Sequence, residues 1–387
     1  MPGAFAFTLT GRDGQARTGR ITTPHGAIET PAFMPVGTRG AVRGVTQRAL
    51  RATGAEILLA NTYHLYLRPG DALIAERGGL HRFIGWSGPM LTDSGGYQIF
   101  SLGPMVRISE EGARFRSHLD GSLHTFTPER VVDIQAQLGP DIAMVLDECL
   151  AAPATEEATA RSLDLTLRWA QRARNRFLEL QAGPVAGVIV STPGQAQFGI
   201  VQGGVHRHLR AHSAEALQAI GFESYAIGGL SVGEPVAVMY DVVGFTAPLL
   251  PEDRPRYLMG TGMPDDLVEC VARGIDLFDC VLPTRNGRNG QAFTPDGPIN
   301  LRNARFARDD RPIAEGCPCE TCQGHSRAYL RHLFQAQEMT AGTLTSVHNL
   351  VFYLDTLKRI RQAIGFGMFE QFRLKFHRHF SRTPHAS

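Results

Sequence analysis

The stretch PMLTDSGG at residues 89–96 joins a short apolar run to an aspartate, a serine and two glycines. The same order, an apolar run followed by polar or glycine residues, recurs along the 387-residue chain. The eight runs are PAFMPVG (31–37), EILLANTY (56–63), PMLTDSGG (89–96), DIAMVLDE (141–148), FGIVQGG (198–204), SYAIGGLS (224–231), RYLMGTG (256–262) and DLFDCVLPT (276–284). Apolar runs of this length bounded by turn residues predict eight buried β-strands.

Helical patterns fill the intervals between these runs. The clearest begins at Thr155, with Glu156 and Glu157 in its first turn, where acidic side chains complement the helix dipole. The expected helices cover residues 45–53, 128–138, 155–177, 209–220, 236–245 and 265–272. Apolar strands that alternate with helices predict a parallel sheet covered on its outer face, and closure of that sheet gives an α/β fold of the (β/α)8 TIM barrel type. An open doubly wound sheet is the alternative, but the first βα turn has no glycine-rich phosphate loop.

Four segments depart from this alternation. The first thirty residues and residues 97–127 are predicted to form β-hairpins, because turn residues separate their short apolar pieces. Residues 182–197 are compatible with an extra strand or a loop. The expected division is therefore 1–284 for the hairpins and barrel core, 285–348 for an inserted subdomain that contains the cysteines at 317, 319 and 322, and 349–387 for C-terminal helices that complete the barrel and a basic tail.

The amino-acid composition limits the partners and the cellular location that can be expected. The formal net charge is +2 and 43% of residues are hydrophobic, so the global charge does not indicate a nucleic-acid partner. The basic residues are nearly all arginine, which reflects either a GC-rich genome or phosphate recognition. No apolar run approaches the ~20 residues of a membrane span, and the first residues do not resemble a signal peptide. Six cysteines in a chain of this length do not suggest a disulfide framework, so we expect a cytoplasmic protein without membrane contact.

Cysteines at residues 317, 319 and 322 form a C-x-C-x-x-C motif in a polar loop. Three thiolates and one imidazole make a closed tetrahedral zinc site of the structural type. His348 is the preferred fourth ligand, while His325 and His332 remain alternatives. We therefore expect one structural Zn²⁺ held by Cys317, Cys319, Cys322 and His348.

Polar residues stand where the predicted strands end, and the active sites of such barrels lie at that face. The polar residues are Asn61, His64, Asp93, Asp147, Glu148, Gln202 and Asp279, and Gly228, Gly229 and Met259 stand at the same strand ends. Carboxylates, an amide and glycines suit a neutral heterocycle. Asp147 could accept from the N–H edge of a purine, Gln202 and the Gly229 amide could donate to its carbonyl, and Tyr97 and Met259 could cover its faces.

Each residue also has a simpler interpretation. Asp147 alone could cap a helix, and the glycines after Asp93 could form a plain turn. A purely structural role is less expected for Asp279, because burying a carboxylate within an apolar run costs free energy unless the carboxylate is paired or functional. Two carboxylates that face one pocket suggest glycosidic chemistry, in which one attacks the anomeric carbon and the other moves a proton. At this point their roles are interchangeable.

Several long motifs resemble those of the bacterial queuine tRNA-ribosyltransferases, also called tRNA-guanine transglycosylases. The resemblance covers nearly the whole chain. The matching motifs are ATGAEILLANTYHLYLRPG, LTDSGGYQ, SHLDGS, DECLAAPAT, GIVQGG, YAIGGLSVGE, YLMGTG, FDCVLPTRNGRNGQAF, DGPINLRNARF and the C-x-C-x-x-C cluster.

The resemblance implies a reaction and a role for each residue. The family exchanges the wobble guanine of GUN-anticodon tRNAs (for aspartate, asparagine, histidine and tyrosine) for preQ1, 7-aminomethyl-7-deazaguanine, through a covalent tRNA adduct in queuosine biosynthesis. By motif, Asp279 is the nucleophile and Asp93 the general acid/base. The implied base-binding residues are Asp93, Tyr97, Asp147, Cys149, Gln202, Gly229, Leu230 and Met259. Arg285 and Arg288 would hold the backbone of the anticodon stem-loop.

Further expectations concern substrate and assembly. Cys149 and Val232 resemble the form that takes preQ1, and the family forms homodimers through the zinc region. Met263 departs from the lysine of some members, and His325 stands where an aromatic residue often follows the zinc cysteines. One rival is a barrel glycosidase that hydrolyses rather than exchanges. The second is a non-catalytic RNA-binding partner subunit, which should have lost the nucleophile or base-reading residues, whereas Asp93, Asp147 and Asp279 are all present.

Overall fold

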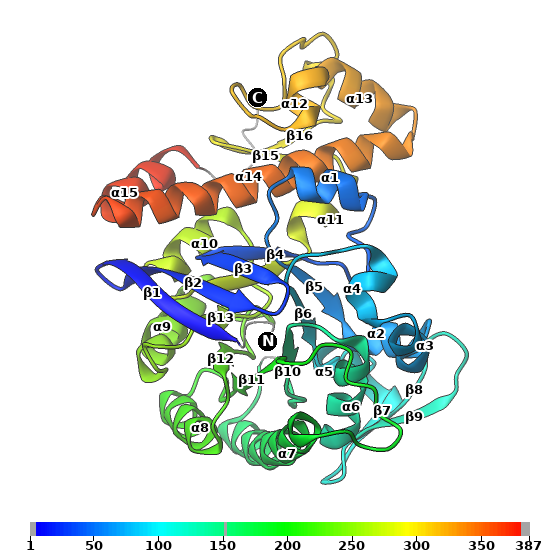
Figure 1. The fold of residues 1–387 in the computed structure, drawn as a ribbon. Coiled ribbons are helices and arrows are strands. Elements are labelled where there is room, and N and C mark those ends of the chain that lie inside the picture. The colour runs from blue at the N-terminus through cyan, green and yellow to red at the C-terminus, as the bar shows by residue number, and fades with distance from the viewer. Residues whose placement is uncertain (1–4, 151–152, 381–387) are drawn as a thin grey trace.

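The computed structural model describes residues 5–150 and 153–380. Its centre is a parallel sheet whose eight strands coincide with the eight predicted runs. The strands, in sheet order, are β4 (Ala32–Pro35), β14 (Leu277–Cys280), β13 (Arg256–Leu258), β12 (Ser224–Ile227), β11 (Ala196–Val201), β10 (Ile142–Met144), β6 (Met90–Asp93) and β5 (Leu58–Asn61). A parallel bridge between Val36 and Leu59 joins the two outer strands, so the sheet closes into the expected barrel (Figure 1).

Helices surround this barrel, and their ends carry the expected capping residues. The Thr127 hydroxyl accepts from the Arg130 amide at the start of α6, and Thr155 caps α7 in the same way. The predicted helices appear as α1 (Gln47–Ala52), α6 (Pro128–Leu138), α7 (Glu156–Ala182), α8 (Arg207–Ile220), α9 (Val236–Thr246) and α10 (Pro264–Val271). Between β5 and β6 lie α2 (Thr62–Leu67), α3 (Asp71–Glu76) and α4 (Gly79–Ile84), and η2 (Ala247–Leu249) follows α9. None of the helices in the described parts of the chain combines the length and apolar character needed to cross a membrane.

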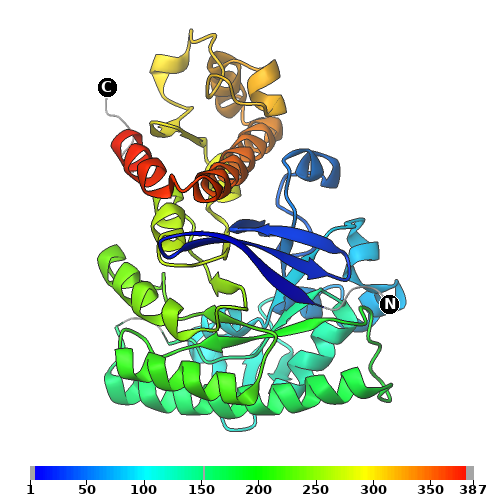
Figure 2. The same ribbon diagram turned by 60° about the vertical axis from the view of Figure 1, so that its left-hand side comes forward.

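The predicted N-terminal hairpins form one antiparallel sheet of β1 (Ala6–Asp13), β2 (Ala16–Thr23) and β3 (Gly26–Thr30). Its side chains bind residues that precede barrel strands: the Arg17 guanidinium donates to Asp276, and His25 bonds Asp141. The sheet therefore covers the amino-terminal end of the barrel (Figure 2). The opposite, carboxyl end is left for a ligand.

Residues 97–127 differ from the prediction at their start, where the short helix α5 (Gly96–Phe100) and η1 (Gly103–Met105) precede the strands. The remainder is an antiparallel sheet of β7 (Val106–Ile108), β8 (Ala113–Arg116) and β9 (Leu123–Phe126), as expected for hairpins. Residues 183–195 contain only one isolated bridge, between Val185 and Val188, so the stretch left open between strand and loop is mostly loop.

The cysteine-containing part follows α11 (Leu282–Arg288). It consists of β15 (Gln291–Thr294), β16 (Gly297–Asn300), η3 (Ala304–Phe306), α12 (Glu320–Gly324) and α13 (Arg327–Gln335). The long helix α14 (Met339–Gly365) and α15 (Phe369–His379) lie between these elements and the barrel (Figures 1 and 2). Residues 348 and 349, where the sequence suggests a boundary, both lie inside α14, and the end of the basic tail lies outside the described residues.

Candidate active site and metal centre

A cavity of about 320 Å³ opens at the carboxyl ends of the barrel strands. Ten of the residues proposed from the sequence line it: Asp93, Tyr97, Asp147, Cys149, Gln202, Gly229, Leu230, Met259, Asp279 and Arg285. Arg288 does not line it. A larger cavity of about 500 Å³ lies beside the cysteine cluster and α15, but it contains neither of the two strand-end aspartates. The strand-end cavity is therefore the candidate active site.

Asp279 lies near the end of β14, and two hydrogen-bond donors bind the same oxygen of its carboxylate. The Tyr257 hydroxyl donates to Oδ1 at 2.6 Å and the Gly260 amide at 2.8 Å. Burial raises the pKa of Asp279, and these two hydrogen bonds lower it. Among the described residues, Oδ2 has no hydrogen-bond donor. One oxygen is thus anchored and the other is available to a ligand.

Asp93 ends β6, and its two oxygens are both engaged. Asn61 Nδ2 donates to Oδ2 at 2.5 Å, while the amides of Thr62 and Gly95 each donate to Oδ1 at 3.2 Å. Burial raises the pKa of Asp93 to about 7, the three donors oppose this shift, and the neighbouring Asp279 carboxylate adds to it. A carboxyl group with a pKa near neutrality can exchange a proton at physiological pH.

Asp147 and Gln202 form a pair across the pocket. Gln202 Nε2 donates to Asp147 Oδ2 at 2.6 Å, and both side chains are buried. Burial raises the pKa of Asp147 to about 6. The pair offers carboxylate acceptors beside an amide, the combination that complements a purine edge with adjacent donors and acceptors.

Arg210 lies behind this pair and is fully buried. Its Nη1 donates at 2.8 Å to the carbonyls of Val201 and Gly228, and its Nε donates at 2.8 Å to the carbonyl of Gly204. It therefore ties together the backbone after β11 and β12, where Gln202 and Gly229 stand. Burial lowers its pKa to about 10, so it remains a cation at neutral pH.

Two arginines follow Asp279 along α11. Arg285 is exposed and lines the cavity, whereas Arg288 is partly buried beyond it. Burial and the nearby Arg43 and Arg285 cations lower the pKa of Arg288. The side chains of Arg43, Arg285 and Arg288 form a positively charged group that could bind an anion at the edge of the pocket. Tyr97, also at this edge, exposes 60% of its surface.

Sequence patterns did not identify Tyr257 and Arg210 as site residues. Tyr257 meets Asp279 because β13 pairs with β14 in a register that sets Tyr257 beside Leu277. Asn61 was noted only as a strand-end residue, although it donates to Asp93 across the β5–β6 pair. For Tyr257 and Asn61 the available signal was a position in or at the end of a predicted strand, but their partners depend on strand register. Arg210 lies in the predicted helix 209–220, and its partners depend on how α8 packs against the barrel.

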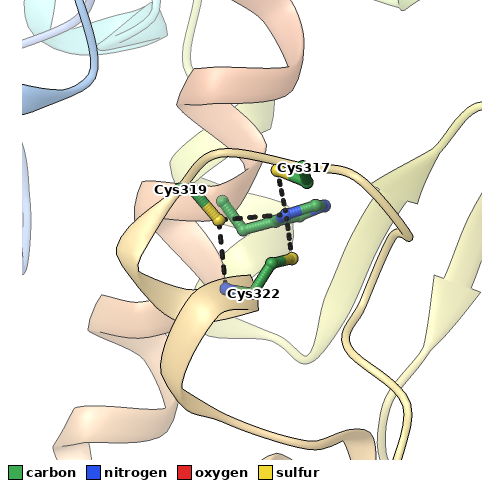
Figure 3. A group of neighbouring side chains, drawn as sticks. Cys317, Cys319 and Cys322 are labelled. Atoms are coloured by element: carbon green, nitrogen blue, oxygen red, sulfur yellow. Dashed lines mark hydrogen bonds between the residues drawn. The ribbon is translucent and has the colours of Figure 1, made fainter.

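The four predicted metal ligands lie together. Nδ1 of His348 is 3.6, 3.6 and 3.3 Å from the sulfurs of Cys317, Cys319 and Cys322, and Figure 3 shows the three cysteine side chains converging. A tetrahedral zinc ion with ordinary bond lengths separates a sulfur and a nitrogen ligand by about 3.6 Å. His348 Nε2 is 2.8 Å from the Phe293 carbonyl, which orients Nδ1 toward the sulfurs. The cluster can hold a metal ion, and its histidine is His348 rather than His325 or His332.

A second cluster, His25, His81 and Asp141, also has metal-ligand residue types. Its imidazoles are stacked 3.6 Å apart, and Asp141 binds His25 Nδ1 at 2.9 Å and His81 Nε2 at 3.1 Å. The amides of His25 and Met90 donate to the same carboxylate. These four hydrogen bonds occupy both oxygens of Asp141. The cluster therefore has a structural role, in which it links the N-terminal sheet to α4 and the barrel.

Comparison with known proteins identifies the family. The model of the family described as queuine tRNA-ribosyltransferase matches residues 13–382. The chain belongs to the queuine tRNA-ribosyltransferase family. Similar proteins with that description occur in Cereibacter sphaeroides (53% identity, 97% of both chains), Solidesulfovibrio magneticus (55%, 95% of both chains) and Zymomonas mobilis (52%, 98% of this chain and 96% of the relative).

Membership of the queuine tRNA-ribosyltransferases confirms the family that the motifs indicated, and with it the class of enzyme. The chain is a pentosyltransferase of tRNA modification, a tRNA-guanine transglycosylase. Its substrate is tRNA. The pocket with two neighbouring carboxylates is thus available for chemistry at a ribosyl carbon.

Proposed function

We propose that the chain exchanges the wobble guanine of GUN-anticodon tRNAs for preQ1 by double displacement at the ribose anomeric carbon. The observation that carries this proposal is the difference between the two aspartates. Asp279 has one anchored and one free oxygen, while Asp93 has a pKa of about 7. The first arrangement suits a nucleophile, and the second suits an acid that later becomes a base.

In the first half-reaction, Oδ2 of Asp279 forms a bond to C1′ as the bond from C1′ to the guanine nitrogen breaks. Asp93 gives its proton to the leaving guanine. In the second half-reaction, Asp93 takes a proton from preQ1, whose ring nitrogen attacks C1′ and releases Asp279. The two displacements retain the configuration of the ribose.

Base recognition is proposed for the residues around the Asp147–Gln202 pair. Asp147 accepts from the N–H edge of guanine or preQ1, and Gln202 with the Gly229 and Leu230 backbone binds the carbonyl side. Tyr97 and Met259 cover the ring faces, and Cys149 lines the pocket beneath. The target nucleotide must leave its stack to reach this site, and Arg285 and Arg288 would hold the phosphates beside it.

We further propose that the metal is one structural Zn²⁺ per chain. Three sulfurs and one nitrogen fit a closed zinc site. The ion would fasten the cysteine-containing loop and α12 to α14, which carries His348, and would so stabilise the proposed 285–348 subdomain. Metal analysis of Cys317→Ala should show loss of zinc and of thermal stability. Full retention of zinc would contradict this ligand set.

A homodimer through the zinc region and a cytoplasmic location are also proposed. His325 stacks on Tyr329 with ring centres 5.2 Å apart, and Tyr329 and Met339 expose 44% and 90% of their surface. This surface has aromatic and apolar character suited to a second copy. A cytoplasmic location accords with tRNA as substrate and with cysteines kept as thiols.

The exchange assay tests the proposed reaction. One anticodon stem-loop is incubated with labelled guanine, preQ1 or queuine in parallel. We expect incorporation of guanine and preQ1 and little incorporation of queuine. Release of guanine without incorporation would instead indicate the glycosidase alternative.

A further inference from the structure

Three arginines share one face of the β7–β9 sheet. Arg107 of β7 pairs directly with Arg114 of β8, and Arg116 lies two residues further along β8 on the same face. All three are exposed. Together with Met105 and Leu123 they line a shallow hollow of about 440 Å³. We refer to Arg107, Arg114 and Arg116 as the arginine face.

Within the described part of the chain, no acidic side chain forms an ion pair with the arginine face. Like charges directly opposite each other destabilise a sheet, yet none of the ion pairs found among residues 5–150 and 153–380 includes any of the three. The nearest acids in sequence have other partners: Glu110 binds Arg168, Glu111 accepts from the Ser109 hydroxyl, and Asp120 accepts from the Ser122 hydroxyl. The arrangement is suited to an anion supplied from outside.

The opposite face of the sheet fixes its position beside the active site. Phe115 packs against Tyr63 of α2 with ring centres 5.4 Å apart. The turn between β8 and β9 reaches the same helix, where His118 Nδ1 lies 2.7 Å from the Tyr63 hydroxyl. Because α2 begins directly after Asn61, the residue that donates to Asp93, the sheet is packed against an element that adjoins the pocket, and the arginine face is on the side of the sheet turned away from α2.

We propose that the arginine face binds the sugar-phosphate backbone of the tRNA, outside the nucleotide that enters the pocket. The inference rests on the proposed function, since it requires that the tRNA is bound with its target base at Asp93 and Asp279. Arginine suits this role because its guanidinium binds phosphate oxygens through two parallel hydrogen bonds. Such contacts position the RNA and carry no sequence information.

Binding of fluorescent tRNA to the full chain tests the proposal, measured by anisotropy between about 50 and 200 mM salt. The double variant Arg107→Gln/Arg114→Gln should bind roughly tenfold more weakly, and its salt dependence should be lower by about one unit of log–log slope per lost contact. The charge-retaining variant Arg107→Lys/Arg114→Lys should recover most of the affinity. Recovered tRNA affinity in this variant would show that the glutamine variant binds weakly because it lost charge and not because it is misfolded.

The matched control is Arg12→Gln/Arg20→Gln, which removes the same charge from exposed pairs in the N-terminal sheet. It should leave tRNA affinity unchanged. An unaltered affinity and salt slope in Arg107→Gln/Arg114→Gln would overturn the proposal and is also the result expected if the face serves an acidic protein. Guanine exchange by the wild-type chain is read in parallel, so failure of the proposed function is recognised separately.

Discussion

Asp93 and Asp279 have the same side chain but different surroundings. Burial raises the pKa of Asp279, while two hydrogen bonds to one of its oxygens oppose that shift and favour the ionised form. Asp93 is engaged on both oxygens, yet burial still raises its pKa to about 7. Two neighbouring carboxylates whose environments separate their protonation are a recognised basis for dividing acid and nucleophile roles.

The pKa of Asp93 predicts an alkaline limit to the reaction. Adduct formation needs Asp93 protonated, and the protonated fraction falls as pH rises through about 7. We expect the rate of single-turnover adduct formation to decline about tenfold per pH unit above that value. Asn61→Ala removes a donor that lowers this pKa, so its alkaline limb should move to higher pH. A limb at the same pH in wild type and Asn61→Ala would contradict the role of Asp93.

At the scale of elements, the turns that follow β11 and β12 shape the base site. Gly229 has a φ of +66°, a left-handed conformation that favours glycine. A Cβ at this position would lie 2.3 Å from Gln202 Oε1. The turn can therefore approach the Gln202 amide only because residue 229 has no side chain. Arg210 holds the same turn through a hydrogen bond to the Gly228 carbonyl.

Gly229→Ala should weaken base binding by displacing Gln202 from Asp147. We expect the KM for free guanine to rise about tenfold or more, which corresponds to about 1.4 kcal/mol. Gly221→Ala is the matched control, because Gly221 also has a positive φ of 82° but a Cβ there would meet no atom within 4 Å. Both variants should lose about 1 kcal/mol of stability. Equal KM values for the two variants would show that the contact with Gln202 has no role in base binding.

Elements were more predictable from the sequence than the contacts between them. The eight strands were identified because each buried run ends abruptly in polar residues, and the C-x-C-x-x-C spacing indicated the metal cluster. The lengthened end of α7 at Ala182 and the helix α5 were missed. The apolar periodicity does not locate the last turn of a long helix, and it does not reveal a helix of a single turn. Tyr257 and Arg210 could not be assigned, because their partners arise from strand register and packing between distant segments.

At the scale of the whole molecule, one end of the barrel is sealed and the other is open. The seal depends on Arg17, which is 1% exposed and donates to Asp276 at 2.5 Å. Asp276 also accepts from the Arg256 amide at the start of β13. The ion pair thus fastens the N-terminal sheet to the barrel, and the open end retains the pocket and Arg285.

Arg17→Met should destabilise the fold by about 3–5 kcal/mol, because it leaves the buried Asp276 carboxylate without its cation. Arg12→Met is the control, since Arg12 forms an exposed pair with Glu252 and should cost at most about 1 kcal/mol. Urea unfolding of both variants gives the comparison. Similar losses in the two variants would mean that the N-terminal sheet is not held by Arg17.

The most direct test of the central claim is to trap the covalent tRNA adduct and resolve it on a denaturing gel. Wild-type protein incubated with tRNA should give a band that retains RNA, because Asp279 is bonded to the ribose. Asp279→Asn should give no such band, even though it still binds tRNA and retains its metal. A stable RNA adduct of Asp279→Asn would contradict the assignment of Asp279 as the nucleophile.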